Sequence, residues 1–246
     1  MAHRFFVAPE SIRDNRVAFN AAQAHQLRAV LRMKPGARIV VLDNRETEYD
    51  VVLDQVSPAG VGGEIVARRA AQGEPRTQVV LYQGLLKADK FEWVLQKGTE
   101  IGISEFVPVV TERSIARQVG RQKFARWHQI VAEAAEQAGR GKIPTLQPLQ
   151  SFEQALLSAQ KRGGTFLMPF EGAREHDLHA ALQDWSGNLA QLLVGPEGGF
   201  TGRQVRAAEA RGAQAITLGP RILRAETAGL VAASVILYAR GDLSRV

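Results

Sequence analysis

The chain has 246 residues, of which 45% are hydrophobic and 23% are charged, as in ordinary folded globular proteins. It has no cysteine, which excludes a disulfide scaffold, a thiolate metal site and a cysteine nucleophile. The longest apolar stretch, 228–239, is too short to span a bilayer, and the first residues contain no apolar core of signal-peptide length. We therefore expect a cytoplasmic protein with no membrane partner. The net charge of +6 permits a polyanionic partner.

The first seventy residues have the pattern of a small β-barrel. Short β-rich runs at 38–43, 48–53 and 63–69 alternate with turn sequences, and one short helical pattern lies at 21–31. The composition of 70–75 is typical of a linker. We expect a first domain over residues 1–72.

From residue 73 onward, strand patterns alternate with helical ones. This alternation predicts an α/β domain over 73–246 with a mainly parallel sheet. The expected strands are 79–85, 106–110, 165–168, 189–194 and 215–218. The expected helices include 90–101, 121–138, 151–160 and 226–240, and the glycines Gly139 and Gly241 are placed to end two of them.

The loop after strand 189–194 is the most informative segment. Its glycines at 195, 198 and 199 let backbone amides approach a ligand, and Thr201 with Gln204 has the spacing of a capping box that starts a helix. The loop matches neither a Walker loop nor the dinucleotide fingerprint, and Glu197 would repel a phosphate. A neutral or cationic ligand fits it, such as the sulfonium of S-adenosylmethionine. A tight turn without a ligand fits it equally well.

Two further loops follow strands in the same way, at 168–172 and at 219–228. Because the carboxyl ends of parallel strands lie at one edge of a sheet, we expect these loops to meet the 195–201 loop there. A glycine-proline pair opens both the 195–201 and the 219–228 loop.

The positive charge is concentrated in the middle of the chain. Residues 75–150 hold eleven Lys or Arg against seven acidic residues, which is +4 of the total +6. A solvated helix face and an RNA-binding surface both fit this cluster. His176 and His179 have helical spacing but no third ligand, so we expect no metal site. Trp93, Trp127 and Trp185 lie in apolar helical patterns and are expected in the core.

Two C-terminal motifs give a specific resemblance. Gly-Pro-Glu-Gly-Gly-Phe-Thr at 195–201 and Leu-Gly-Pro-Arg-Ile-Leu-Arg-Ala-Glu-Thr-Ala at 218–228 resemble the RsmE family, together with segments at 3–7, 96–102, 112–114 and 136–140. Members of this SPOUT-class family methylate N3 of a uridine in 16S ribosomal RNA. The resemblance implies a PUA-like β-barrel followed by an α/β domain tied in a trefoil knot, and a homodimer.

The resemblance also implies that the knotted loops hold S-adenosylmethionine. The cofactor contacts that it implies are Met168, Glu171, Leu193, Gly195, Gly199, Leu218, Gly219, Ile222, Leu223, Thr227 and Ala228. The RNA contacts that it suggests are Lys87, Arg113 and Arg140, with Arg4, Arg28 and Arg32 extending the surface onto the barrel. Each of these six is also explained as a solvated surface residue.

The chemistry of such a reaction assigns two catalytic candidates. The N3 lone pair of uracil is unavailable until its proton leaves, so the enzyme must accept that proton and stabilise the anionic base. Arg224 is the expected stabilising cation and Glu226 the expected proton acceptor. Glu226 is equally explained as an acid at a helix N-terminus. The alternative functions are ribose 2′-oxygen methylation by the same class, and RNA binding without catalysis.

Overall fold

The computed structural model describes residues 3–183 and 185–244. Two compact units make up the chain: one is Met1–Glu74 with Ala135–Ile143, and the other is Pro75–Ala134 with Pro144–Val246. The segment Ala135–Ile143 lies inside the range 73–246 of the expected second domain, yet it packs with the N-terminal unit.

The N-terminal unit is built on one sheet, six-stranded within the described residues, with the order β1-β4-β5-β6-β3-β2. β1 runs parallel to β4, and the other neighbours are antiparallel. Its strands are β1 (Arg4–Phe6), β2 (Ile12–Arg13), β3 (Arg16–Ala18), β4 (Arg38–Leu42), β5 (Thr47–Ser57) and β6 (Gly60–Ala70). The helix α1 (Ala21–His25) continues into a π-helical turn, Gln26–Val30.

This sheet is bent around its own core. The β5–β6 register shifts between Asp50 and Val51 and again between Leu53 and Gln55, and such bulges bend a strand. At Gly63 an added Cβ would lie 2.8 Å from Cγ1 of Val51, so the close approach of the two strands requires glycine. The core side chains include Phe5, Val17, Leu27, Ile39, Val41, Val51, Leu53 and Ile65.

A buried ion pair anchors the segment Ala135–Ile143 within this unit. The guanidinium of Arg140 donates from Nη2 to Oε2 of Glu74 at 2.8 Å and from Nε to Oε1 at 3.1 Å, and its side chain is 3% exposed. Oε1 of Glu74 also accepts from the backbone N–H groups of Gly141 and Lys142. Because two backbone donors and one arginine meet one carboxylate, this turn is fixed to the end of the Met1–Glu74 stretch.

The C-terminal unit contains a sheet that is seven-stranded within the described residues, with the order β10-β8-β7-β12-β11-β13 and β9 also paired with β8. Every pair in it is parallel. Its strands are β7 (Gln78–Gly84), β8 (Glu105–Val110), β9 (Thr145–Leu146), β10 (Gln150–Ser151), β11 (Thr165–Pro169), β12 (Leu189–Val194) and β13 (Gln214–Ile216). The expected parallel sheet is confirmed.

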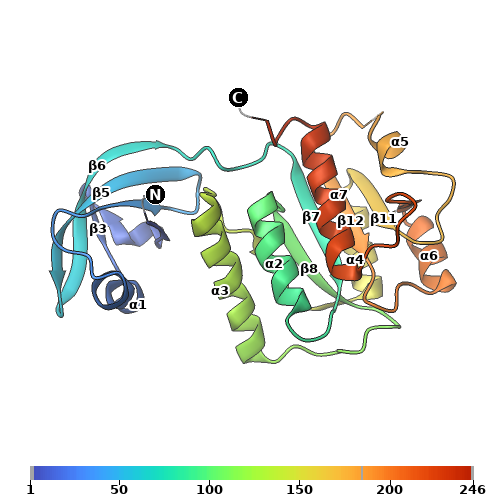
Figure 1. Cartoon of the computed structure of the whole chain (residues 1–246), viewed down its shortest axis with the longest axis horizontal. Helices are drawn as coiled ribbons and strands as arrows, with labels where there is room; N and C mark the ends of the chain where they lie inside the picture. Colours follow the sequence, from blue (N-terminus) through green and yellow to red (C-terminus); the bar gives the residue numbers. More distant parts are fainter. Residues whose placement is uncertain (1–2, 184, 245–246) are drawn as a thin grey trace. The chain divides into compact units, whose positions relative to one another are not determined.

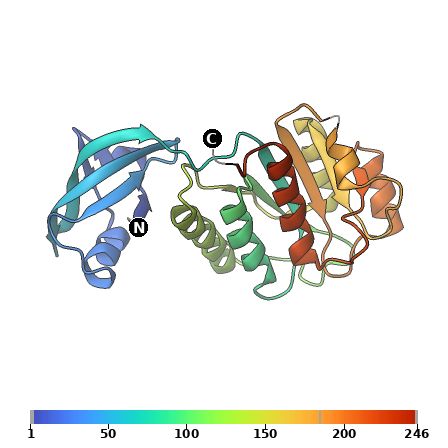
Figure 2. The ribbon, with the colours of Figure 1, turned by 45° about the horizontal axis from the view of Figure 1, so that its top comes forward.

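Helices cover both faces of this sheet (Figures 1 and 2). α4 (Phe152–Arg162) and α6 (Gly202–Glu209) share one buried cluster with Val80 and Tyr82 of β7. α2 (Lys90–Ile101) and α7 (Ala225–Ala239) pack together on the opposite face, where Gly229 of α7 lies against Leu81 and Val194. Successive strand residues point to opposite faces of the sheet, which is why Leu81 packs against α7 and Tyr82 lies in the cluster with α4 and α6.

Two more helices complete the fold. α3 (Arg121–Ala138) stacks Trp127 on Phe91 of α2, with ring centroids 4.3 Å apart. The short α5 (Leu178–Gln183) contacts α7. Trp127 is 1% exposed, as expected, but the core prediction for Trp93 is wrong, because that side chain is 44% exposed on α2. It is also wrong for Trp185, which is half-buried in the segment after α5 and lies outside any helix.

Local sequence signals placed the helices accurately. α2 and α3 have the expected bounds, and Gly139 ends α3 with a φ of +73° that favours glycine. The capping boxes at Ser151 and Thr201 are both formed. Over residues 3–183 and 185–244, the structure contains no helix that is long and apolar enough to cross a membrane.

Candidate cofactor and catalytic site

Three loops meet at the carboxyl edge of the parallel sheet, after β11, β12 and β13. β11 lies between β12 and β13 in the sheet, so the loops that follow these three strands emerge side by side. The expectation that the two glycine-proline loops lie at one edge is confirmed. The loops line two adjoining pockets, which share Pro169, Glu171, Ile222, Leu223 and Ala228.

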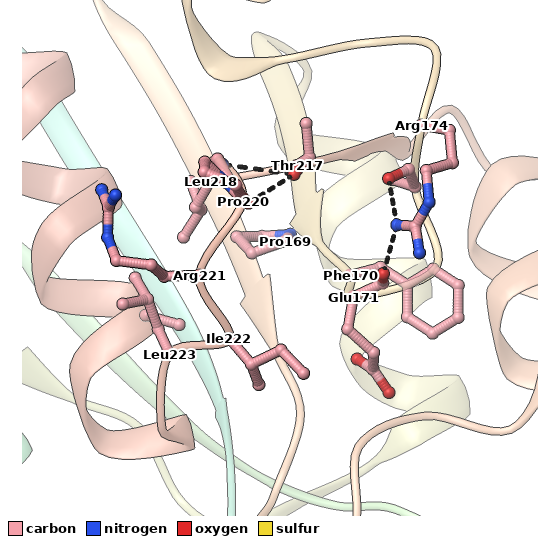
Figure 3. A pocket seen from close by; sticks show the side chains of 13 residues that line it. Pro169, Phe170, Glu171, Arg174, Thr217, Leu218, Pro220, Arg221, Ile222 and Leu223 are labelled. Atoms are coloured by element: carbon pink, nitrogen blue, oxygen red, sulfur yellow. Dashed lines mark hydrogen bonds between the residues drawn. The ribbon is translucent and has the colours of Figure 1, made fainter.

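The first pocket, called here the loop pocket, has a volume of about 680 Å³. The loop after β11, called here the post-β11 loop (residues 170–174), forms one wall, and the segment from Thr217 to Leu223 forms the other (Figure 3). Nη1 of Arg174 donates to the carbonyl oxygens of Glu171 at 2.6 Å and Ala173 at 3.0 Å, which fixes the turn of the first wall. Its thirteen lining residues are Pro169, Phe170, Glu171, Ala173, Arg174, Thr217, Leu218, Gly219, Pro220, Arg221, Ile222, Leu223 and Ala228.

The second wall turns sharply at Gly219. The backbone N–H of Gly219 donates to Oγ1 of Thr217 at 3.2 Å, and that hydroxyl in turn donates to the carbonyl oxygen of Gly219. Gly219 has a φ of +100°, a conformation that side chains with a Cβ rarely adopt. After this turn, Ile222 projects with 87% of its side chain exposed.

The second pocket, called here the carboxylate pocket, has a volume of about 510 Å³. It lies between the 195–201 loop, called here the post-β12 loop, and the start of α7. It is lined by the cations Lys90 and Arg224 and by the carboxylates Glu171, Glu197 and Glu226, which gives a net charge of −1 at neutral pH. This net charge favours a ligand with a net positive charge, whereas the 195–201 loop alone led us to expect a neutral or a cationic ligand, or none.

Glycines let the post-β12 loop follow the pocket wall closely. A Cβ at Gly195 would stand 3.2 Å from the backbone of Gly199, and one at Gly199 would stand 3.1 Å from Oε1 of Glu171. Gly199 also has a φ of +66°, and its N–H donates to the carbonyl oxygen of Pro196 at 2.8 Å. A side chain at either position would therefore crowd the neighbouring part of the pocket wall.

Other contacts hold this loop from outside. Nε2 of the buried Gln83 donates to the carbonyl oxygen of Gly195 at 3.3 Å. The backbone N–H of Lys87 donates to Oε1 of Glu197 at 3.1 Å, and Nη1 of Arg113 donates to the carbonyl oxygen of Gly198 at 2.8 Å. The loop is therefore held by three separate donors.

The structure brings most of the expected cofactor contacts together. Glu171, Gly195, Gly199, Leu218, Gly219, Ile222, Leu223 and Ala228 line one or both pockets. Three others do not. Met168 and Leu193 are fully buried in the sheet core, and Thr227 lies on the first turn of α7, where its N–H donates to the carbonyl oxygen of Arg224.

Both expected catalytic residues line the carboxylate pocket. Arg224 is the N-cap residue of α7 and its side chain is exposed, whereas the side chain of Glu226, two residues further on, is 15% exposed. Lys90, which the sequence patterns did not single out, lies 3.3 Å from Oε1 of Glu226 through its Nζ atom. No local signal links Lys90 to a residue so far along the chain.

The expected RNA-binding residues have different surroundings. Arg28, Arg32, Lys87 and Arg113 are exposed, and Arg4 is partly exposed in an ion pair with Glu48. Arg140 is the exception, because its guanidinium is buried against Glu74. This burial contradicts the expected phosphate contact for Arg140, since a buried, paired arginine leaves no face for RNA. Within the described residues, no group of three or more His, Cys, Asp or Glu side chains is placed to hold a metal ion.

The sheet and its loops define the class of α/β proteins that hold a ligand at the carboxyl edge of parallel strands. A family model described as RNA methyltransferase domain matches residues 73–237. The chain is 32% identical over 231 residues to the ribosomal RNA small subunit methyltransferase E of Bacillus subtilis (strain 168), covering 89% of this chain and 90% of that protein. It is 34% identical over 238 residues to the protein of the same name from Synechocystis sp. (strain ATCC 27184 / PCC 6803 / Kazusa), covering 96% and 77%.

Solved structures agree. A ribosomal RNA small subunit methyltransferase E from Neisseria gonorrhoeae, bound to S-adenosyl methionine, matches with a TM-score of 0.87 at 30% identity, covering 97% of this chain and 98% of that one. A protein from Legionella pneumophila, in complex with the bound cofactor SAM, matches with a TM-score of 0.85 at 25% identity, covering 97% of this chain and 98% of that one. The chain belongs to the ribosomal RNA small subunit methyltransferase E family, which confirms the resemblance found in its sequence.

Proposed function

We propose that this chain uses S-adenosylmethionine to methylate N3 of one uridine in the 16S ribosomal RNA of the small ribosomal subunit. The observation that carries this proposal is the carboxylate pocket, which Arg224 and Glu226 at the start of α7 line together with the glycine-rich loop after β12. Family membership and the cofactor bound to two structural relatives support it. The substrate would place the protein in the cytoplasm.

The residues of the site fit the cofactor. S-adenosylmethionine carries a net positive charge and supplies an electrophilic methyl group on its sulfonium. The carboxylate pocket has a net charge of −1, which favours this positively charged cofactor. Gly195 and Gly199 carry no side chain, so the cofactor could approach their backbone. We propose contacts from the pocket-lining residues Glu171, Gly195, Gly199, Leu218, Gly219, Ile222, Leu223 and Ala228, and backbone contacts from Met168, Leu193 and Thr227.

Arg224 and Glu226 would divide the work on the base. Glu226 accepts the N3 proton of uracil, so that the N3 lone pair becomes available to form the bond to the methyl carbon as the carbon–sulfur bond breaks. Arg224 stabilises the negative charge that develops on a uracil oxygen, because its guanidinium is cationic at every working pH. The side chain of Glu226 is 15% exposed, which limits its contact with water.

RNA would be held by exposed cations on both units. We propose Arg4, Arg28 and Arg32 on the N-terminal unit and Lys87 and Arg113 on the C-terminal unit as phosphate contacts, which position the substrate without reading its sequence. Lys87 and Arg113 also hold the post-β12 loop, so a phosphate contact at either residue would lie next to the cofactor pocket.

We also propose three features of the assembly. The curled N-terminal sheet, with its bulges and its close approach at Gly63, supports a PUA-like barrel over residues 1–72. The return of the chain from the edge strand β13 to the middle of the sheet at α7 supports a trefoil knot within 73–246. An apolar stripe on α7, formed by Val231, Val235 and Tyr238, supports a homodimer.

Mass spectrometry of small-subunit ribosomal RNA tests the function. Ribosomal RNA from cells lacking the gene should lose one 3-methyluridine, and the purified protein with S-adenosylmethionine should restore it. A missing ribose methyl group would instead indicate 2′-oxygen methylation. Calorimetry that detects no cofactor binding, with or without RNA, would indicate an RNA-binding protein without catalysis.

A further inference from the structure

One ammonium group joins three elements of the carboxylate pocket. Lys90 is the first residue of α2, and its Nζ lies 3.3 Å from Oε1 and 3.5 Å from Oε2 of Glu226 on α7. The same Nζ lies 3.8 Å from Oε1 of Glu197 in the post-β12 loop. The side chains of Lys90, Glu226 and Glu197 are 36%, 15% and 27% exposed, so this contact is screened less than a surface pair.

We propose that Lys90 is a positioning residue for methyl transfer, which holds the carboxylate of Glu226 in the pocket. This inference rests on the proposed function, because it assigns Lys90 a role through the proton acceptor. Both oxygens of Glu226 lie within reach of one Nζ, so rotation of the carboxylate out of the pocket would break two contacts at once.

The surroundings of Glu226 explain why it needs a partner. Glu226 lies in the first turn of α7, where the exposed N–H groups of the helix attract a carboxylate toward the backbone. A carboxylate bound there cannot accept a proton from a base in the pocket. Lys90 approaches from α2, the helix packed beside α7, and its Nζ lies within reach of both carboxylate oxygens of Glu226, so it competes with the α7 backbone for them.

Lys90 is poorly suited to a direct role in cofactor binding. Its ammonium has three donors, and two carboxylates already surround it. Glu197 also has a second donor, the backbone N–H of Lys87, so the post-β12 loop keeps a tie to this region without the Lys90 side chain. Removal of the ammonium should therefore affect the reaction more than the cofactor.

Single-turnover methyl transfer and cofactor calorimetry test this role with a set of variants. Lys90→Met should slow the transfer step at least tenfold while the dissociation constant of S-adenosylmethionine changes less than twofold. Lys90→Arg, which keeps the charge, should recover the rate to within about threefold of wild type. Lys161→Met, an exposed lysine on α4, is the control and should match wild type.

A double variant separates action through Glu226 from a general structural effect. If Lys90 acts through Glu226, then Lys90→Met should cause no further loss in a Glu226→Gln background, because the partner is already gone. A double variant whose loss of rate is the product of the losses in the two single variants would overturn the inference. So would a Lys90→Met enzyme with the wild-type rate, or one whose whole loss is explained by weaker cofactor binding.

The same experiment distinguishes failure of this inference from failure of the proposed function. If the wild-type protein forms 3-methyluridine and Lys90→Met forms it at the same rate, the positioning role is refuted and the proposed function stands. Wild-type protein that transfers no methyl group to small-subunit RNA would refute both.

Discussion

Gly84, at the end of β7, lies directly against the glycine-proline turn that follows β12. A Cβ at Gly84 would stand 2.7 Å from Cδ of Pro196 and 2.8 Å from the carbonyl carbon of Gly195, closer than such atoms can approach. Gly84 has no positive φ, so space and not backbone conformation requires glycine here. The contact joins two neighbouring strands, in which Gln83 pairs with Val194.

Replacement of Gly84 by alanine should therefore weaken cofactor binding. The new methyl group must displace Gly195 and Pro196, which line the carboxylate pocket, and we expect the dissociation constant of S-adenosylmethionine to rise about tenfold, equivalent to about 1.4 kcal/mol. Calorimetry measures this constant. Gly120→Ala is the control, because a Cβ there meets no atom within 4 Å. Equal affinities in the two variants would contradict the steric argument.

Local signals explain how much of this fold was predictable. The caps Ser151, Thr201 and Gly139 act within one helical turn, so the sequence alone placed the ends of three helices. Alternation of strands and helices predicted the parallel sheet, and the sheet then placed both glycine-proline loops at one edge.

Contacts between distant residues were not predictable in this way. Lys90 meets Glu226, and Gly84 meets Pro196, only because β7 pairs with β12 in the middle of the sheet, and periodicity does not give strand order. The burial of Arg140 escaped prediction for a related reason. Its partner, Glu74, lies 66 residues earlier, and a basic cluster has the same pattern whether its side chains face RNA or a buried carboxylate.

Loss of the Arg224 guanidinium should slow chemistry without loss of cofactor. Arg224 is exposed at the rim of the carboxylate pocket, so Arg224→Ala removes a charge that would face the uracil and leaves the loop walls unchanged. We expect methyl transfer to drop at least tenfold, which is about 1.4 kcal/mol in the barrier, with cofactor affinity within twofold of wild type. Single-turnover assays and calorimetry give the two quantities. Arg206→Ala, an exposed arginine on α6, is the control, and wild-type turnover by Arg224→Ala would remove Arg224 from the mechanism.

Asp242 should make the stability of the C-terminal unit depend on pH. Its carboxylate is 3% exposed and accepts from the backbone N–H groups of Arg76 at 3.0 Å and Thr77 at 3.1 Å. Burial alone would raise the pKa of Asp242, but hydrogen bonds from Thr77 and Arg76 outweigh it and hold this pKa below the ordinary value of 3.8. A lowered pKa in the folded state means that the stabilisation is complete above the unfolded pKa and is lost as the pH falls through the folded one.

Asp242→Asn should thus lower the free energy of unfolding by about 1–3 kcal/mol near neutral pH, because one backbone donor then faces an amide N–H₂ group. The difference from wild type should stay constant from about pH 8 to pH 5 and shrink below about pH 4. Urea titrations at a series of pH values measure it. Glu209→Gln, an exposed acid at the end of α6, should show neither the loss nor the pH dependence. A pH-independent difference would show that the charge of Asp242 contributes nothing.

The apolar stripe on α7 should be the surface through which two copies associate. Val231, Val235 and Tyr238 are spaced along one side of α7 and are 37%, 40% and 73% exposed, and Trp93 on the adjoining helix α2 is 44% exposed. Val235→Asp would bury an unpaired carboxylate in such an interface, so the dimer dissociation constant should rise at least about tenfold. Sedimentation equilibrium measures this dissociation constant.

The control variant is Leu157→Asp. Leu157 is matched in exposure, at 44%, but lies on α4 across the sheet, so this variant should remain dimeric. A wild-type monomer, or dissociation caused by Leu157→Asp alone, would place the stripe outside any dimer contact.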